Sequence, residues 1–413
     1  MNGVFATSMN CLECGREYGL DAAISTCPAC DGLVDVKYDY ARILEAVERQ
    51  ELRTRRVNSI WRYAEFLPIP AGDAISLGEG CTPLVKAQNL GHAIDLRNLY
   101  FKLDFTCPTG SFKDRGASVM ISKAKHLRIK AVAIDSSGNA AAAIAGYAAK
   151  AGLQCYVFAP SYASEAKLIQ SLAYGATVYA VDGTRRETYQ TAKEAYQHFG
   201  WYYCGFQTNP YAVEGTKTVA YEICEQLEWA PPDHIVFPVG SSSNLVGCWK
   251  GLKELRRLGW IPHLSSLACI QSEGCAPIAA AYKTGSMTII PVEQPKTVAE
   301  GLMISHPLKG SLALQALSET EGSAEIVTDA EILQAGKLLA KREGLFVEPS
   351  TAVSIAGVRK LAEAGLIAKD ELVVCVLTGS GLKTREAYSK LVGRPTTVKP
   401  SLEAIKAIMR RQS

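Results

Sequence analysis

The chain has 413 residues, a net charge of +3 at pH 7, 48% hydrophobic residues and 21% charged residues. This length exceeds that of one small core and predicts two or three domains of an ordinary soluble globular protein. Charges of both signs are nearly balanced, no dense run of Lys or Arg occurs, and no apolar run has the length of a membrane span, so we expect neither a nucleic-acid partner nor a membrane.

Two CxxC pairs lie near the start of the chain, Cys11 with Cys14 and Cys27 with Cys30. Four thiolates at this spacing can hold one tetrahedral metal ion, usually Zn²⁺, and predict a zinc-ribbon-like segment over residues 1–38 with a structural zinc. The alternatives are two disulfides or four unrelated thiols. The other cysteines occur singly within apolar patterns, as buried thiols do in a reducing compartment, so we expect a cytoplasmic protein.

Short β-rich runs alternate with helical patterns through most of the remaining chain. The predicted strands cover 99–103, 131–135, 154–159, 177–181, 201–204, 234–239, 267–271, 345–347 and 372–377. The predicted helices cover 40–51, 117–124, 140–151, 164–174, 185–199, 244–258, 276–282, 329–342, 352–364 and 382–391. This alternation is typical of α/β proteins whose parallel sheets are covered by helices on both faces. Ligands of such sheets bind beyond the carboxyl ends of the strands, so the loops there form the candidate site.

The first candidate loop carries Lys113 between Gly110-Ser111-Phe112 and Gly116, directly before a predicted helix. The positive end of a helix dipole disfavours a cation, which lowers the pKa of the amine. A lysine that condenses with a carbonyl must supply its amine in the neutral form, so this position suits nucleophilic chemistry. The alternative is a surface lysine in a glycine-bounded turn.

A second loop, at the end of the next predicted strand, consists of Ser136, Ser137, Gly138, Asn139 and Ala140. Small residues allow backbone amides to approach an anion, and the start of a helix favours a carboxylate there. The side-chain amide of Asn139 can also donate to a phenolate oxygen. The alternative is an asparagine that caps the helix after a Ser-Gly turn.

A third strand-to-helix loop consists of Gly240, Ser241, Ser242, Ser243 and Asn244. A run of small residues at the start of a helix can form a phosphate cradle of amides and hydroxyls. Neither a P-loop lysine nor a GxGxxG pattern is present, so the loop suits one phosphate better than a nucleotide. The alternative is an ordinary polar turn.

A fourth loop begins with Thr378, at the end of the last predicted strand. Thr378 is expected to project its hydroxyl at the edge of the sheet, or else to cap the turn. The segment over 347–352 has the same strand–turn–helix form. A lysine able to form an imine, a single-phosphate cradle, an amide and a hydroxyl together suit pyridoxal 5′-phosphate (PLP), bound through Lys113 as a Schiff base.

These loops resemble the motifs of the tryptophan-synthase-β-like PLP enzymes (fold type II), and among them most closely those of the threonine synthase family. The cofactor-lysine motif of that family is similar to PTGSFKDRG at 108–116 nearly letter for letter. Further similar segments are GEGCTPL at 78–84, NPYAVEGTKT at 209–218, SGN at 137–139 and TGSGLK at 378–383. Several family members also carry an N-terminal ribbon.

The resemblance implies two doubly wound parallel-sheet domains. The large PLP-binding domain covers 39–125 and 205–395, the small α/β domain covers 126–204, and a C-terminal helical tail covers 396–413. A small amino-acid substrate and a homodimer are expected as well.

The resemblance also implies roles for the loop residues. Lys113, with Phe112 beside it, holds PLP and moves protons as general base and acid, while Asn139 bonds the ring oxygen. Thr378 faces the pyridine nitrogen, where a neutral hydroxyl suits elimination and replacement better than transamination. The cofactor phosphate is held by Gly240, Ser241, Ser242, Ser243 and Asn244. The substrate carboxylate is held by the amides of Ser136, Ser137, Gly138, Asn139 and Ala140.

Several positions depart from the family's pattern, and they bear on the substrate. Cys81 replaces an asparagine, Ala212 an arginine, Thr216 a glutamine and Ser380 a histidine, and three serines in the phosphate loop replace Asn-Gly-Gly of the family's Gly-Asn-Gly-Gly-Asn. Without that arginine, a dianionic substrate such as O-phosphohomoserine is disfavoured, and we expect weak or absent threonine formation from it. Other basic residues could compensate, and the candidates are Arg115, Arg185 and Lys217.

The leading hypothesis is a PLP-dependent lyase or synthase that performs elimination or replacement at Cβ or Cγ of an amino acid. One alternative is an ammonia-lyase of the serine/threonine dehydratase type, because TVAEGL at 297–302 resembles a segment of those enzymes. Another is a β-replacement enzyme resembling cysteate synthase. From a different class, the chain could be a cofactor-free zinc-ribbon binding protein. A metal-activated hydrolase is disfavoured because none of the six histidines lies in an HxH or HExxH pattern.

Overall fold

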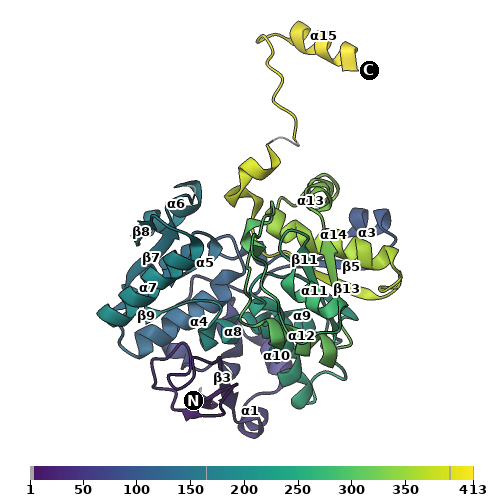
Figure 1. The fold of residues 1–413 in the computed structure, drawn as a ribbon. Coiled ribbons are helices and arrows are strands. Elements are labelled where there is room, and N and C mark those ends of the chain that lie inside the picture. The colour runs from purple at the N-terminus through teal and green to yellow at the C-terminus, as the bar shows by residue number, and fades with distance from the viewer. Residues whose placement is uncertain (1–3, 164, 390–391, 413) are drawn as a thin grey trace.

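A computed structural model describes residues 4–163, 165–389 and 392–412. These residues form a larger and a smaller sheet in two lobes, an antiparallel ribbon near the N-terminus and a C-terminal helix that stands apart from the body (Figure 1). None of the helices in the described ranges is long and apolar enough to span a bilayer.

The larger sheet has the strand order β12-β11-β10-β13-β5-β4, in which β4 runs antiparallel to β5 and the other neighbours are parallel. Its strands are β4 (Leu84–Lys86), β5 (Asn98–Lys102), β10 (His234–Pro238), β11 (Ser266–Ser272), β12 (Ser323–Val327) and β13 (Leu372–Val376). Along β13, Val374 and Val376 enter one apolar core, whereas Val373 and Cys375 enter a second core on the other face. A strand buried on both faces must be apolar throughout, which explains its continuous hydrophobic sequence.

Helices cover both faces of this sheet. Side chains of α9 and α10 belong to the first core, and those of α13 and α14 belong to the second. The helices of this lobe are α3 (Gln88–Ala93), α8 (Pro210–Thr216), α9 (Thr218–Gln226), α10 (Ser243–Arg257), α11 (Pro277–Lys283), α12 (Gly310–Glu319), α13 (Asp329–Glu343) and α14 (Pro349–Glu363).

The smaller sheet is parallel throughout, with the order β8-β7-β6-β9. Its strands are β6 (Ala131–Asp135), β7 (Gln154–Pro160), β8 (Thr177–Val181) and β9 (Tyr202–Tyr203). The neighbouring helices are α4 (Lys113–His126), α5 (Asn139–Ala151), α6 (Glu165–Ala173) and α7 (Arg185–Phe199). Helix α4 packs against α5 of this lobe and against α8 of the other, so it connects the two lobes.

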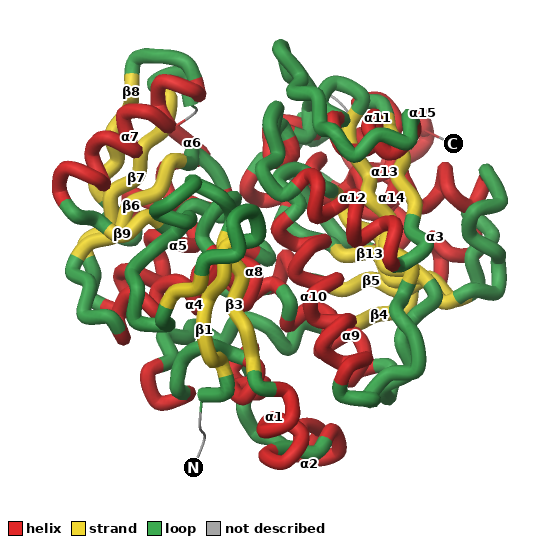
Figure 2. The backbone as a smooth tube through the Cα atoms, turned by 60° about the horizontal axis from the view of Figure 1, so that its bottom comes forward, coloured by secondary structure: helices red, strands yellow, loops and turns green. Residues whose placement is uncertain are grey.

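The N-terminal ribbon is an integral part of the fold. Its strands β1 (Ala6–Cys11), β2 (Glu17–Tyr18) and β3 (Val34–Tyr38) pair in the antiparallel order β2-β1-β3, and β1 and β3 lie beside α4 and α8 (Figure 2). Met9 is fully buried and accepts a hydrogen bond from Tyr211 on α8, and Lys250 on α10 forms an ion pair of 2.5 Å with Asp35. The ribbon therefore buries side chains in the main core.

Three predicted elements are wrong. The segment over 345–347 is no strand, because the chain makes one bridge, from Val347 to Ser380, and then enters α14. The helix predicted over 382–391 is replaced by two short 3₁₀ turns, Gly381–Lys383 and Arg385–Tyr388, with residues 390–391 outside the described ranges.

The third error is the helix predicted over 40–51. Extended backbone at Val47 divides it into α1 (Tyr40–Ala46) and α2 (Arg49–Thr54). In the predicted C-terminal tail, the helix is α15 (Leu402–Gln412).

Candidate active site

Lys113 is the first residue of α4, and its half-buried amine lies between two aromatic rings. Its Nζ is 4.4 Å from the ring centre of Phe112 and 4.4 Å from that of Phe206. Nζ makes no hydrogen bond or ion pair with any residue that the structure describes. Burial lowers the pKa of Lys113 to about 8, so part of the amine is neutral near physiological pH.

The loop after β13 pairs with the lysine loop through the backbone. The Phe112 amide donates to the Thr378 carbonyl at 2.9 Å, and the Ser380 amide donates to the Gly110 carbonyl at 3.0 Å. These two bonds hold Thr378 beside the start of α4, although the loops are more than 250 residues apart in the sequence.

The loop that opens α5 meets the start of α14 and the loop after β13. Asn139 Nδ2 donates to Glu348 Oε2 at 2.8 Å, and the hydroxyls of Thr351 and Thr378 share a hydrogen bond of 3.0 Å. Burial raises the pKa of the Glu348 carboxyl. Gly379 lies so close to Glu348 that a Cβ at position 379 would overlap the Glu348 carboxylate. This explains why the position is a glycine.

The helix-capping alternative for Asn139 does not hold, because Gly138 occupies the N-cap of α5 and the Asn139 side chain contacts Glu348 instead. The residues of this loop are all partly exposed, as a substrate-binding loop requires: Ser136, Ser137, Gly138, Asn139 and Ala140.

The serine-rich loop joins the site through Phe206. Ser243 opens α10, and its hydroxyl donates to the Phe206 carbonyl at 2.7 Å. Three buried polar atoms of this loop have no partner among the described residues: Ser242 Oγ, Asn244 Oδ1 and Asn244 Nδ2. Buried polar atoms without partners are costly, so their presence indicates a polar ligand at this loop.

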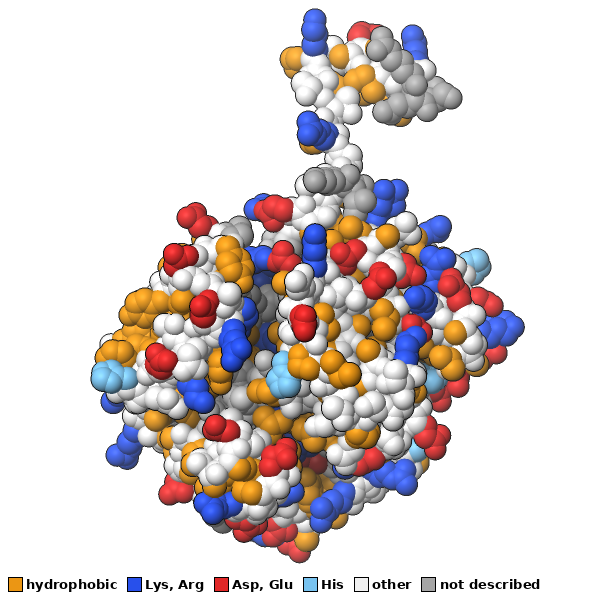
Figure 3. All heavy atoms as spheres, in the orientation of Figure 1, with side chains coloured by type: hydrophobic (Ala, Val, Ile, Leu, Met, Phe, Trp, Pro, Cys, Tyr) orange, Lys and Arg blue, Asp and Glu red, His pale blue; other side chains and the backbone are white. Residues whose placement is uncertain are grey.

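All four predicted loops therefore converge near Lys113, and the surface is hollowed between the two lobes that supply them (Figure 3). Sequence analysis did not identify two residues of this region, Phe206 and Glu348. Phe206 follows the carboxyl end of β9, and Glu348 lies in the segment over 347–352 directly before α14. The rule that ligands bind at strand ends could have found Phe206.

Ala212 is packed inside the fold. Its side chain has no exposed surface, and its backbone lies against Gly116, one turn after Lys113, in the interface of α4 and α8. Thr216 is also fully buried, and its hydroxyl donates to the Ser243 carbonyl at 3.0 Å. Position 212 is thus part of a packed interface, and Thr216 supports the serine-rich loop from behind.

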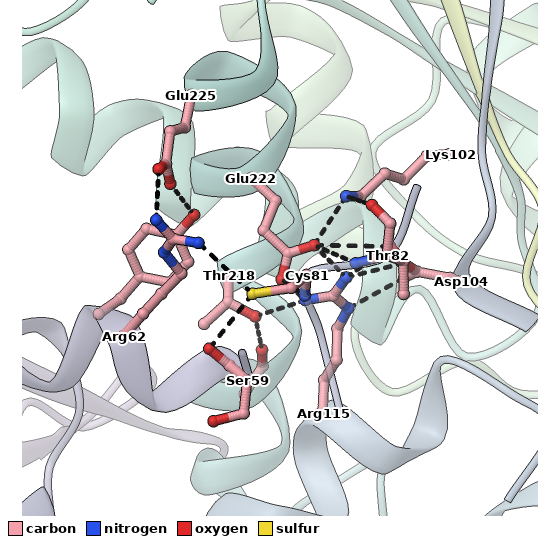
Figure 4. A network of polar contacts seen from close by, with 12 residues as sticks. Ser59, Arg62, Cys81, Thr82, Lys102, Asp104, Arg115, Thr218, Glu222 and Glu225 are labelled. Atoms are coloured by element: carbon pink, nitrogen blue, oxygen red, sulfur yellow. Dashed lines mark hydrogen bonds and ion pairs between the residues drawn. The ribbon is translucent and has the colours of Figure 1, made fainter. Parts of the chain in front are cut away.

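Arg115 does not compensate for the missing arginine. It is fully buried and donates to Asp104 at 2.8 Å and to Glu222 at 2.6 Å (Figure 4). Lys102 contacts the same Glu222 at 2.7 Å. Burial alone would raise the pKa of the Glu222 carboxyl, but Arg115 and Lys102 hold it well below its usual range.

Lys217 and Arg185, the other two residues considered as replacements for the arginine, also form ion pairs within the protein. Lys217 is fully buried between Glu214 and Glu254, at 2.7 and 2.9 Å. Arg185 donates to the Asp135 carboxylate at 2.8 Å at the end of β6, and its side chain stays half exposed. Of the three, Arg185 alone retains exposed surface.

The four ribbon cysteines form a compact cluster. Their sulfur atoms all lie within 4.8 Å of one another, with 3.5 Å between Cys11 and Cys30 and 3.7 Å between Cys14 and Cys27. All four thiols are free, so the two disulfides considered as an alternative are not formed. The spacing fits sulfur atoms at about 2.3 Å from a shared tetrahedral ion.

A family model described as pyridoxal-phosphate dependent enzyme matches residues 75–379. The chain belongs to this family. It is similar to the threonine synthase of Methanocaldococcus jannaschii, with 39% identity over 97% of this chain and 98% of the relative. The threonine synthase of Methanosarcina acetivorans is 41% identical over 96% of this chain and 97% of the relative.

A solved structure of threonine deaminase isoform 2 from Solanum lycopersicum has a TM-score of 0.65 at 22% identity, covering 75% of this chain and 84% of that one. This likeness concerns the fold, which is PLP fold type II. The family match and the relatives above identify a PLP-dependent lyase of the threonine synthase-like group.

The residues present fit the cofactor of this family. Within the described ranges, Lys113 offers an amine without a competing partner, and the serine-rich loop offers buried polar atoms without partners. Ser111, two residues before the lysine, adds a buried hydroxyl that also lacks one among the described residues.

Proposed function

We propose that PLP attaches to Lys113, that Gly240 to Asn244 hold its phosphate, and that Asn139 and Thr378 contact its ring oxygen and pyridine nitrogen. The observation that carries this proposal is the half-buried, unpaired amine of Lys113 at the meeting point of four loops. The cofactor, when bound, withdraws electrons from Cα of an amino acid.

The chain's own residues supply the remaining steps. Amides of Ser136 to Ala140 hold the substrate carboxylate at the start of α5. Lys113, once displaced by the substrate amine, removes and returns protons, and a pKa of about 8 allows both. Thr378 is neutral, which favours elimination and replacement.

We propose a small amino acid with a leaving group at Cβ or Cγ as the substrate. Relatives that are named threonine synthase support a leaving group at Cγ. The expectation of weak O-phosphohomoserine turnover rests mainly on the absence of an arginine at position 212, and the packed, fully buried Ala212 gives it poor support.

A panel of O-phosphohomoserine, O-phosphoserine, serine and threonine tests this proposal, with phosphate, ammonia and keto acid measured in parallel. We expect product from an amino acid with a β or γ leaving group, dependent on PLP. Protein that binds no PLP, or that processes none of the panel, would contradict the proposal and favour the cofactor-free binding protein.

A dehydratase-type ammonia-lyase is the second candidate. The dehydratase-like segment lies against the serine-rich loop: a Cβ at Gly240 would be 3.0 Å from Leu302 Cα. Ammonia and keto acid from serine or threonine, without phosphate release from the phosphorylated substrates, would select this candidate.

We also propose a structural zinc at Cys11, Cys14, Cys27 and Cys30, a cytoplasmic location and a homodimer. Metal analysis should find about one zinc per chain. Cys27→Ser should remove the zinc and lower the melting temperature while the visible band of bound PLP persists. Cys375→Ser, at a buried strand cysteine, is the control that should keep the zinc.

A further inference from the structure

Lys309 lies directly before α12, in a segment to which sequence analysis assigned no role. Its side chain is 3% exposed, and Nζ donates to the backbone carbonyls of Phe206, at 3.0 Å, and Gln207. An ammonium group has three donors, so one N–H has no partner among the described residues.

The charge of Lys309 is unusual among the buried lysines. Lys102 and Lys217 contact carboxylates, and Lys123 lies 5.5 Å from the ring centre of Tyr211. Lys309 contacts backbone carbonyls alone in the part of the chain that the structure describes. A buried ammonium without a counter-ion is strongly disfavoured. Burial, and secondarily the nearby Lys113, lower the pKa of Lys309 to about 7.

Phe206 connects Lys309 to the active site. Its carbonyl accepts from Lys309 and also from the hydroxyl of Ser243, while its ring faces Lys113 at 4.4 Å. The amine of Lys309 is therefore next to the start of α10.

Polar atoms without partners among the described residues lie in the two segments that meet at the Phe206 carbonyl. On the serine-rich loop they are Ser242 Oγ and both polar atoms of Asn244, and Thr208 Oγ1 follows Gln207 directly. All three side chains are at least nine-tenths buried. A cation without a counter-ion, together with the unpaired hydroxyls of Ser242 and Thr208 and the unpaired amide N–H of Asn244, indicates a bound anion.

We propose that Lys309 is a phosphate-binding residue of this active site and supplies positive charge to the bound phosphate. The ligand group is a phosphate monoester, carried either by the cofactor or by the substrate. This inference rests on the proposed function and adds that a phosphorylated ligand is stabilised by a lysine from the segment before α12.

Lys309→Met tests the inference, because methionine fills a similar buried volume without charge. Lys309→Arg keeps the charge, and Lys123→Met is the matched control at an equally buried lysine on α4. The cofactor-free full-length chain is titrated with inorganic phosphate, and the melting temperature is recorded. Phosphate should stabilise the wild type and Lys123→Met, and about tenfold to a hundredfold more phosphate should be needed for Lys309→Met.

Two further measurements distinguish the sources of the phosphate. If the cofactor carries it, the dissociation constant of PLP rises about tenfold or more in Lys309→Met, with partial rescue in Lys309→Arg. If the substrate carries it, PLP affinity is unchanged, whereas KM rises for O-phosphohomoserine or O-phosphoserine and stays constant for serine and threonine.

Either result supports the inference. Unchanged phosphate stabilisation, PLP affinity and KM in Lys309→Met would overturn it. The phosphate titration uses neither cofactor nor amino acid, so its outcome does not depend on the proposed function. A variant without any cooperative melting transition is replaced by Lys309→Gln, which is judged by the same three measurements.

Discussion

Arg115 and Lys113 are two residues apart on α4, and their surroundings differ in charge balance. Arg115 and Lys102 are matched by Asp104 and Glu222, all buried and in contact. Lys113 and Lys309 have no carboxylate partner among the described residues. Residues at i and i+2 of a helix point to different sides, so one helix can hold a closed ion network on one side and a ligand-binding pocket on the other. Balanced buried charge stabilises the position of α4, and unbalanced charge leaves room for a ligand.

The largest expected effect is on turnover, and it follows from changing Lys113 on the ligand-binding side of α4. Lys113→Ala should reduce turnover by about 10³-fold or more, because proton transfer and covalent attachment of PLP both require the amine. The unfolding midpoint should stay close to that of the wild type.

Borohydride treatment followed by mass spectrometry identifies the attachment point. We expect the label on Lys113 in the wild type and none in Lys113→Ala. A label on Lys102 or Lys217 would contradict the assignment of the cofactor lysine.

On the network side, Arg115→Met should lower the free energy of unfolding by about 3–5 kcal/mol, because Asp104 and Glu222 lose a buried cation. Urea unfolding measures this. The control is Arg97→Met, which removes an ion pair with Asp370 that is more than 60% exposed on both sides and should change stability by about 0–1 kcal/mol. Similar losses in both variants would mean that the network does not hold α4.

The free energy of unfolding should depend on pH because Lys309 is buried without a carboxylate partner among the described residues. Lys309 has a folded-state pKa of about 7, below the ordinary value of 10.5, because it is buried and close to Lys113. Between these pH values the unfolded chain binds more protons, so the free energy of unfolding rises with pH, by at most about 1.4 kcal/mol per unit.

Cofactor-free wild type should therefore gain stability relative to Lys309→Met as the pH is raised from 7 to 9. Urea unfolding at pH 6, 7, 8 and 9 gives the difference. A difference that is independent of pH would show that Lys309 titrates as in the unfolded chain.

The smallest expected effect concerns Cys81, which borders the balanced network and has a φ of +47°. Asparagine tolerates this left-handed backbone better than cysteine, so Cys81→Asn should raise the free energy of unfolding by about 0.5–1 kcal/mol. Thermal unfolding checks it, and Cys155→Asn, at a strand cysteine with ordinary backbone, should be destabilising instead. Lower stability of Cys81→Asn would show that the contacts of the thiol with Arg62 and with the Ser59 carbonyl, both at 3.7 Å, outweigh the backbone preference.

The sequence by itself determined the alternation of strands and helices and the positions of the four loops. Strands β6 and β8 and helix α7 have the predicted bounds, because their apolar periodicity and capping residues are local. The spacing of the ribbon cysteines likewise predicted their grouping. The prediction failed over 382–391, where the residues are compatible with a helix but the chain turns around Ser380 and Thr384.

Only the tertiary structure decided which basic side chains have a carboxylate partner. The partners of Arg115 include Glu222, 107 residues away, and Lys309 reaches the backbone of Phe206, 103 residues away. Such pairings depend on how α4, α9 and the segment before α12 pack together, and no local pattern encodes that arrangement. Burial then sets the consequence: the same basic side chain stabilises the fold beside a carboxylate and is available to an anion where no carboxylate lies.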